Sequence, residues 1–154
     1  MGEDRGNYPE LPQDTGNEGL NAALIKAVQE CREKEIRFRY VVMGRPDRID
    51  TMDMGTLLYN LLSNGIEACM AVGTERELEL VVREGNGTTE IFMENTISGS
   101  VMKDNPNLES RKPDKRHHGF GMESIHRIVG KYHGHYSYRE ESGRFIQEID
   151  LRDG

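Results

Sequence analysis

The 154-residue chain lacks tryptophan, long hydrophobic runs and any excess of basic residues, and it has only two cysteines. No stretch approaches the roughly 18 consecutive apolar residues of a membrane span, so we expect no transmembrane helix. Cys31 and Cys69 are too few for a disulfide framework and form no C-x-x-C motif, which favours a reducing compartment. The net charge of −7 argues against nucleic-acid binding, for which a basic surface is usual. The length suits a single domain.

Hydrophobic periodicity predicts three helices and five strands in this domain. The helices are expected at 20–31, from Asp50 or Thr51 to about Met70, and from near Gly121 to a stop at Gly134. The strands are expected at 36–42, 77–83, 88–94, 135–140 and 144–151.

The order of these elements predicts an α/β (α+β) two-layer sandwich, with the helices on one face of a mixed sheet. Residues 1–17 show no apolar periodicity and are expected to be a mobile leader or a cloning remnant, which leaves 18–154 as the domain. A segment at about 95–118 has little regular pattern. Loops of that length are uncommon in compact domains unless they are functional lids or disordered.

Two asparagines interrupt the leucine-rich helix expected at 51–70. Asn60 and Asn64 are four residues apart and Glu67 follows three later, so the three share one helix face. Asparagine is a mediocre helix former, and a polar stripe facing solvent is the simpler interpretation. Two aligned amides flanked by core leucines are also suited to hold a hydrated Mg²⁺ and phosphate oxygens, because Mg²⁺ takes oxygen ligands and keeps several waters.

A second polar feature ends the irregular segment, where His118, Gly119 and Gly121 precede the last helix. A Gly-x-Gly at a helix N-terminus lets backbone N–H groups approach an anion, and the helix dipole favours negative charge there. The preceding loop holds five cationic and three acidic side chains in a chain that is acidic overall, which suits a lid over polyphosphate. A flexible hinge beside a solvated charged loop is the alternative.

The strand expected at 88–94 is followed directly by Asn95. An asparagine at a strand end commonly just starts a turn. Its place at the mouth of the irregular loop makes it the third candidate site residue.

Together these segments resemble the GHKL superfamily of ATPases and kinases, whose fold is the Bergerat fold. Asn60-Leu-Leu-Ser-Asn64-Gly-Ile-Glu67-Ala resembles the N-box, and His118-Gly-Phe-Gly-Met resembles the second glycine box. The resemblance extends over residues 15–152. Within the superfamily, the chain resembles the catalytic, ATP-binding domain of quorum-sensing-type sensor histidine kinases. The usual Asp-x-Gly-x-Gly box is replaced by Asn95-Thr-Ile-Ser-Gly99.

The resemblance implies a role for each candidate residue toward ATP and Mg²⁺. Asn64 would coordinate Mg²⁺ with support from Asn60, and both are expected to serve catalysis. ATP-hydrolysing relatives carry Glu at the Asn60 position; Asn cannot take a proton from water, so transfer rather than hydrolysis is implied. Asn95 stands where most relatives have an Asp that binds the adenine amino group, and it would be a neutral, weaker acceptor. The remaining nucleotide-binding residues implied are Lys115, Arg116, His118, Gly119 and Gly121.

The resemblance also implies partners. The phosphoryl group would go to a histidine on a dimerisation segment not seen in this chain, and then to a response regulator. We therefore expect a cytoplasmic, monomeric fragment of a membrane-anchored homodimeric kinase, unable to phosphorylate itself alone. Two alternatives are an anti-sigma-factor-like serine kinase of the same superfamily and a degenerate module that signals by docking only.

Overall fold

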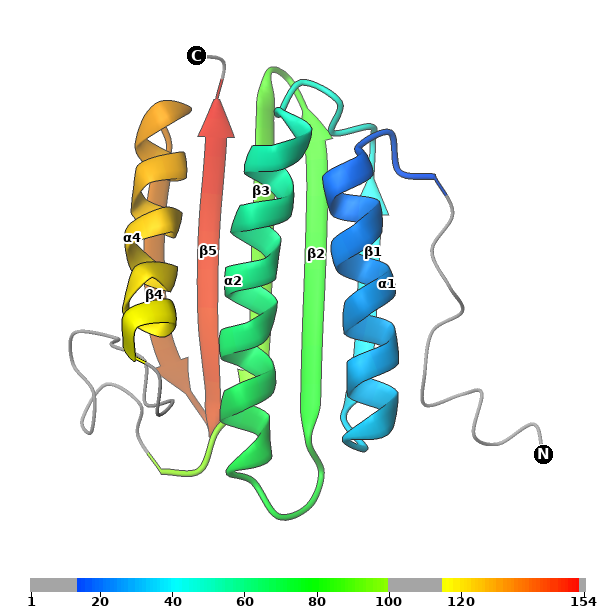
Figure 1. The fold of residues 1–154 in the computed structure, drawn as a ribbon, viewed down its shortest axis with the longest axis vertical. Helices are drawn as coiled ribbons and strands as arrows, with labels where there is room; N and C mark the ends of the chain where they lie inside the picture. Colours follow the sequence, from blue (N-terminus) through cyan, green and yellow to red (C-terminus); the bar gives the residue numbers. More distant parts are fainter. Residues whose placement is uncertain (1–13, 100–114, 153–154) are drawn as a thin grey trace.

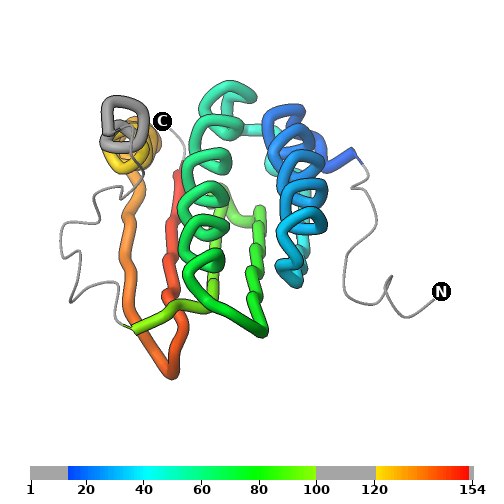
Figure 2. Tube along the Cα trace, turned by 60° about the horizontal axis from the view of Figure 1, so that its bottom comes forward, coloured from blue at the N-terminus to red at the C-terminus, as the bar shows by residue number. Residues whose placement is uncertain are grey.

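The structure is a computed structural model that describes residues 14–99 and 115–152, with the backbone alone for residues 115–120. Its described residues form one layer of helices on one face of a sheet (Figures 1 and 2). The three helices are α1 (Glu18–Glu33), α2 (Thr51–Met70) and α4 (Lys115–Lys131). The five strands are β1 (Arg37–Met43), β2 (Glu77–Gly85), β3 (Thr88–Thr96), β4 (His135–Glu141) and β5 (Arg144–Arg152). The predicted two-layer sandwich is confirmed.

The sheet is mixed, with the strand order β1-β2-β3-β5-β4. β1 and β2 are parallel because α2 carries the chain back between them, and the other pairs are antiparallel. The β2–β3 and β4–β5 hairpins turn through Asn86-Gly87 and Ser142-Gly143, and all four residues have positive φ. This is the backbone that a two-residue type I′ turn requires.

The central helix α2 contacts both α1 and α4 and lies over β2 and β3. Its apolar stripe is buried as the periodicity predicted, at Met54, Leu57, Leu58, Leu61, Leu62 and Cys69, and Ile66 is buried as well. Asp50 is its N-cap and accepts hydrogen bonds from the Met52 and Asp53 backbone N–H groups at 3.0 and 3.1 Å. Capping therefore places the start of α2 where the sequence predicted.

Residues 14–17, assigned from the sequence to the leader, pack against the domain. Asn17 is buried and caps α1, its Oδ1 accepting from Leu20 N at 3.1 Å. Its Nδ2 donates to the carbonyl oxygens of Pro46 and Ile49 at 3.0 and 2.8 Å. The folded unit thus begins before residue 18, because this side chain joins α1 to the segment that leads into α2. Residues 1–13 lie outside the described part of the chain.

Helix α4 differs from its prediction at both ends. It begins at Lys115, six residues before Gly121, so Gly119 and Gly121 lie within the helix. At its end, His133 and not Gly134 has the left-handed backbone, with φ 53°. Gly134 N–H donates to Val129 O and His133 N–H to Gly130 O, which closes the helix as a Schellman motif. Position 134 requires glycine because β5 passes close to its backbone: a Cβ there would stand 1.8 Å from Asp150 O.

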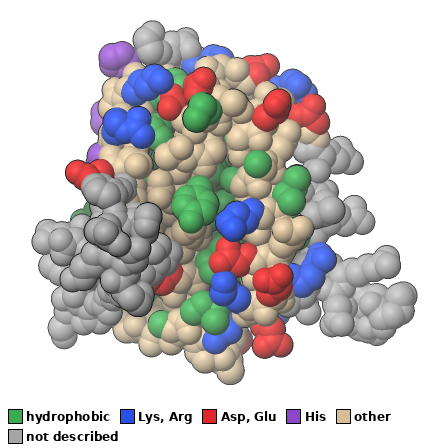
Figure 3. Space-filling model, viewed as in Figure 1, with side chains coloured by type: hydrophobic (Ala, Val, Ile, Leu, Met, Phe, Trp, Pro, Cys, Tyr) green, Lys and Arg blue, Asp and Glu red, His purple; other side chains and the backbone are tan. Residues whose placement is uncertain are grey.

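The core lies between the helix layer and the sheet and takes side chains from all three helices. Hydrophobic side chains that remain exposed on the helix face are separated by charged ones (Figure 3). Within the described residues, no helix is both long and apolar enough to cross a membrane.

Candidate functional site

The amide face of α2 lies against α4. Asn60 and Asn64 are half-buried, so the side chains of both remain accessible at the edge of the core. Asn60 Nδ2 donates to Thr56 O at 2.9 Å, which fixes the side chain. A Cβ built on Gly121 would stand 3.4 Å from Asn60 Oδ1, so α4 approaches the amide closely at this buried glycine. The structure thus brings Asn60 and Gly121, 61 positions apart in sequence, close together.

Asn95 belongs to β3 and lies under α2, beside the helical turn that follows Asn60. Its side chain is 1% exposed, and its backbone position is fixed in the ladder between Leu78 of β2 and Phe145 of β5. A Cβ on Gly65 would stand 3.5 Å from Asn95 Oδ1 and only 2.8 Å from Leu78 Cδ1. Gly65 therefore lets β2 and β3 approach α2 at this point, directly after Asn64.

The structure thus places four of the predicted site residues on or beside α2. Asn60 contacts α4 at Gly121, Asn64 lies one turn further along α2, and Gly65 contacts Asn95. The side chains of Lys115, Arg116 and His118 lie outside the described part of the structure; these residues and Gly119 form the first turn of α4.

The amide oxygens of Asn60 and Asn64 are donors of the kind that a phosphate-bound Mg²⁺ takes. No group of three or more His, Cys, Asp or Glu that could hold a metal ion occurs among the described residues. Asn60 and Asn64 offer neutral amide oxygens, and Mg²⁺ commonly takes few protein ligands while phosphates and waters supply the rest. Both amide oxygens lie on the same face of α2 and could contribute to such a site.

The far ends of α2 and α4 are joined by a polar cluster that periodicity alone could not reveal. The Tyr132 hydroxyl donates to Asp53 Oδ2 at 2.7 Å and accepts from Asp50 N–H at 3.0 Å, while Lys131 Nζ lies 2.7 Å from the same Asp53 oxygen. Burial raises the pKa of Asp53, but the hydrogen bonds from Lys131 and Tyr132 outweigh it, and the pKa lies below its ordinary value. This cluster holds α4 beside the amide face of α2.

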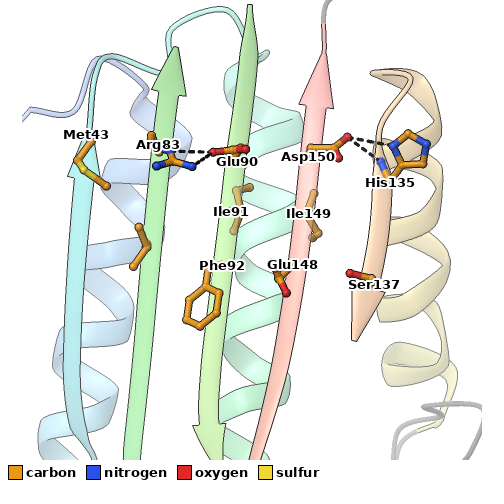
Figure 4. Close-up of a pocket in the computed structure, with 11 residues that line it drawn as sticks. Met43, Arg83, Glu90, Ile91, Phe92, His135, Ser137, Glu148, Ile149 and Asp150 are labelled. Carbon is orange, nitrogen blue, oxygen red and sulfur yellow. Dashed lines mark hydrogen bonds and ion pairs between the residues drawn. The ribbon is translucent and has the colours of Figure 1, made fainter. Parts of the chain in front are cut away.

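A separate groove of about 400 Å³ lies on the opposite, helix-free face of the sheet (Figure 4). Its lining includes Met43, Val81 and Phe92. Polar side chains along it pair with one another, Arg83 with Glu90 in an ion pair and the His135 ring with Asp150 at 3.3 Å (Figure 4). None of the candidate residues lines this groove, so it is not part of the predicted site.

Comparison with known families identifies the family to which the chain belongs. Residues 49–152, more than half of the chain, match the family model described as the GHKL domain. The chain therefore belongs to the GHKL family. No curated protein sequence matches it significantly.

Solved structures of similar fold include catalytic domains of histidine kinases. The catalytic domain of histidine kinase ThkA has a TM-score of 0.70 at 14% identity, covering 94% of this chain and 97% of that one. ThkA in complex with the response regulator TrrA has a TM-score of 0.64 at 14% identity, covering 89% of this chain and 40% of that one. Full-length ShkA in complex with AMPPNP has a TM-score of 0.65 at 15% identity, covering 93% of this chain and 31% of that one. At these identities the likeness shows the fold alone.

Proposed function

We propose that this domain binds Mg²⁺·ATP between α2 and α4 and positions it for phosphoryl transfer to a histidine on another segment. The observation that carries the proposal is the placement of Asn60 against Gly121 and of Gly65 against Asn95. The amide face of α2 is in this way bordered by α4 and by the end of β3 that bears Asn95. The nucleotide complex of ShkA and the regulator complex of ThkA support the same assignment by likeness of fold.

The residues fit a role in holding ATP without hydrolysing it. When bound, Mg²⁺·ATP supplies the transferable phosphoryl group. Asn64 would hold the metal, and the fixed amide of Asn60 would orient the phosphates beside it. Neither side chain can accept a proton from water. Catalysis in such a site is mainly positioning and charge neutralisation. The acceptor histidine and the response regulator are then the partners that complete the reaction.

Replacement of Asn64 by Ala tests this assignment. The variant should lose most Mg²⁺-dependent ADP affinity, measured by titration calorimetry with and without EDTA, while its melting temperature stays near that of the wild type. Because Asn64 is half-buried and lies outside the apolar core, the fold does not depend on it.

Gln29→Ala is the matched control, since it removes an exposed amide from α1, away from the site. This variant should bind Mg²⁺·ADP as the wild type does. Unchanged affinity in Asn64→Ala would contradict the role of Asn64. Equal losses in both variants would show a nonspecific effect and would also refute it.

A further inference from the structure

An apolar patch lies on the helix-free face of the sheet, near its β1 edge. Val41 of β1, Val81 of β2 and Phe92 of β3 are opposite one another in register, so their side chains form one row across this face. Met43, two residues after Val41, lies on the same face and borders the groove in Figure 4. Val41 and Met43 are 47% and 42% exposed. We call these four residues the outer patch.

The described chain begins beside the outer patch. Among the described strands β1 pairs only with β2, so it is an edge of the sheet. Residues 14–17 lie at this edge in both views of the fold (Figures 1 and 2). A Cβ on Gly16 would stand 3.1 Å from the guanidinium of Arg45, which follows Met43 by two positions. Residues 1–13 therefore join the domain at the end of β1 that bears Met43.

The sequence of residues 8–12 has the apolar spacing of the outer patch. Pro9 and Pro12 form a Pro-x-x-Pro pattern, which favours a polyproline II helix of three residues per turn. Tyr8 and Leu11 would lie on one side of such a helix, about 9 Å apart. The row of the outer patch spans two strand spacings, also about 9–10 Å. Because proline has no N–H donor, an additional strand beside β1 is the less favoured alternative.

Reach and charge agree with the spacing. Tyr8 precedes Asp14 by six positions, which allows about 20 Å of extended chain, more than the width of the three strands that carry the outer patch. Residues 1–13 hold three acidic side chains and one basic one, whereas residues 37–45 hold three arginines and no acid. Arg39 is exposed and forms no ion pair with any residue that the structure describes. An acidic segment is therefore attracted to the β1 edge.

We propose that residues 8–11 of this chain bind the outer patch, with Tyr8 and Leu11 on its apolar row and the acidic side chains toward the arginines of β1. Proline-rich segments bind apolar, aromatic-lined surfaces in this way. The segment is tethered to the domain, so its effective concentration is high and a weak contact is enough to hold it. The outer patch lies on the opposite face of the sheet from α2 and α4, and the inference does not depend on the proposed function.

The first test is cross-linking of the full chain with a short bismaleimide. Glu10→Cys lies between the two apolar residues of the segment, and Glu79→Cys lies beside Val81 on the outer face. The control pairs Glu10→Cys with Ala22→Cys, which is exposed on α1 and nearer to Glu10 in sequence. Cys31 and Cys69 are buried in both proteins. The Glu10–Glu79 pair should link within one chain about tenfold faster than the control pair.

Mass spectrometry of a mixture of isotope-labelled and unlabelled chains identifies the linked peptides. Equal rates for the two pairs would overturn the inference. Links that join one labelled and one unlabelled chain would show that a second copy occupies the outer patch, which would overturn it as well.

The second test follows cleavage after Glu10 by glutamyl endopeptidase. Val41→Asp places a charge that repels the segment within the outer patch, and Ile25→Asp does the same on α1 at a side chain of similar exposure, 40% against 47%. Cleavage should be about threefold faster or more in Val41→Asp, and within about twofold of the wild type in Ile25→Asp. Wild-type rates in folded Val41→Asp, or equal acceleration in both variants, would refute the contact. Melting curves show whether each variant is folded; should Val41→Asp fail to fold, the cross-linking result decides.

Discussion

Gly65→Ala distinguishes helix propensity from the packing seen in the structure. In the interior of a helix, Ala is more stable than Gly by roughly 0.5–1 kcal/mol, so the sequence alone predicts a stabilised variant. In the structure, a Cβ at position 65 would stand 2.8 Å from Leu78 Cδ1 and 3.1 Å from Met93 Cε. Both neighbours are buried, at 1% and 0% exposure, so neither can move into solvent.

The two effects can be compared in magnitude. Overpacking a core by one carbon typically costs about 1–3 kcal/mol. With the middle of both ranges, Gly65→Ala should lower the free energy of unfolding by about 1 kcal/mol. For a domain of this size that corresponds to a fall of about 2–4 °C in melting temperature. The displaced side chains lie beside Asn95 Oδ1, so Mg²⁺·ADP affinity should fall as well.

The control is Gly130→Ala in α4, where a Cβ would meet nothing within 4 Å. Here only propensity acts, and the melting temperature should rise by about 1–4 °C. Thermal and urea unfolding of the two variants measure the difference in sign. A Gly65→Ala protein as stable as the wild type, or more stable, would refute the close approach of β2 and β3 to α2.

Three further predictions concern the α2–α4 cluster and a buried thiol. Tyr132→Phe removes a hydrogen bond to a carboxylate and one from Asp50 N–H, and urea unfolding should show a loss of about 2 kcal/mol, or a melting temperature lower by about 4–8 °C. The pKa of Asp53 is lower in the folded state than in the unfolded chain, so its stabilising effect is present above about pH 4 and is lost as the pH falls through the folded-state value. The stability difference between wild type and Asp53→Asn should therefore shrink from pH 6 to pH 3; a constant difference would contradict the bond to Lys131. Burial raises the pKa of Cys31 to about 12, so Ellman's reagent at pH 8 should leave this thiol unmodified until urea unfolds the chain, and rapid modification of the native protein would exclude that burial.

Local chemistry made much of the fold predictable. Alternation and turn residues placed the two hairpins, because an Asn-Gly or Ser-Gly pair at positive φ needs no information from the rest of the chain. The capping carboxylate of Asp50 likewise marked the beginning of α2.

The predictions failed where distant segments decide the structure. Asn17 was assigned to a leader because its cap contacts Pro46 and Ile49 are about 30 positions away. Gly134 takes part in the predicted helix stop through its N–H, but His133 takes the left-handed backbone, and glycine is needed at position 134 because β5 passes close to it at Asp150. Close approach and helix termination both favour glycine, so the residue type alone could not separate them.

The proximity of the candidate site residues was not predictable from the sequence. The spacing of Asn60 and Asn64 marks one helix face, but no sequence pattern shows that Gly121 contacts the first or that Gly65 contacts Asn95. Sequence reasoning noted Gly65 only as a departure from the usual Ala. The helical cost of glycine at that position was the available signal that something packs against it.

The most direct test of the central claim is a thermal shift of the wild-type chain with ADP, with and without Mg²⁺. At a ligand concentration near 100 times Kd, binding to the folded state alone adds about 2.7 kcal/mol of stability. For a chain of this length the account predicts a rise of roughly 5–10 °C that EDTA abolishes. No shift at millimolar ADP in the presence of Mg²⁺ would contradict a nucleotide site between α2 and α4.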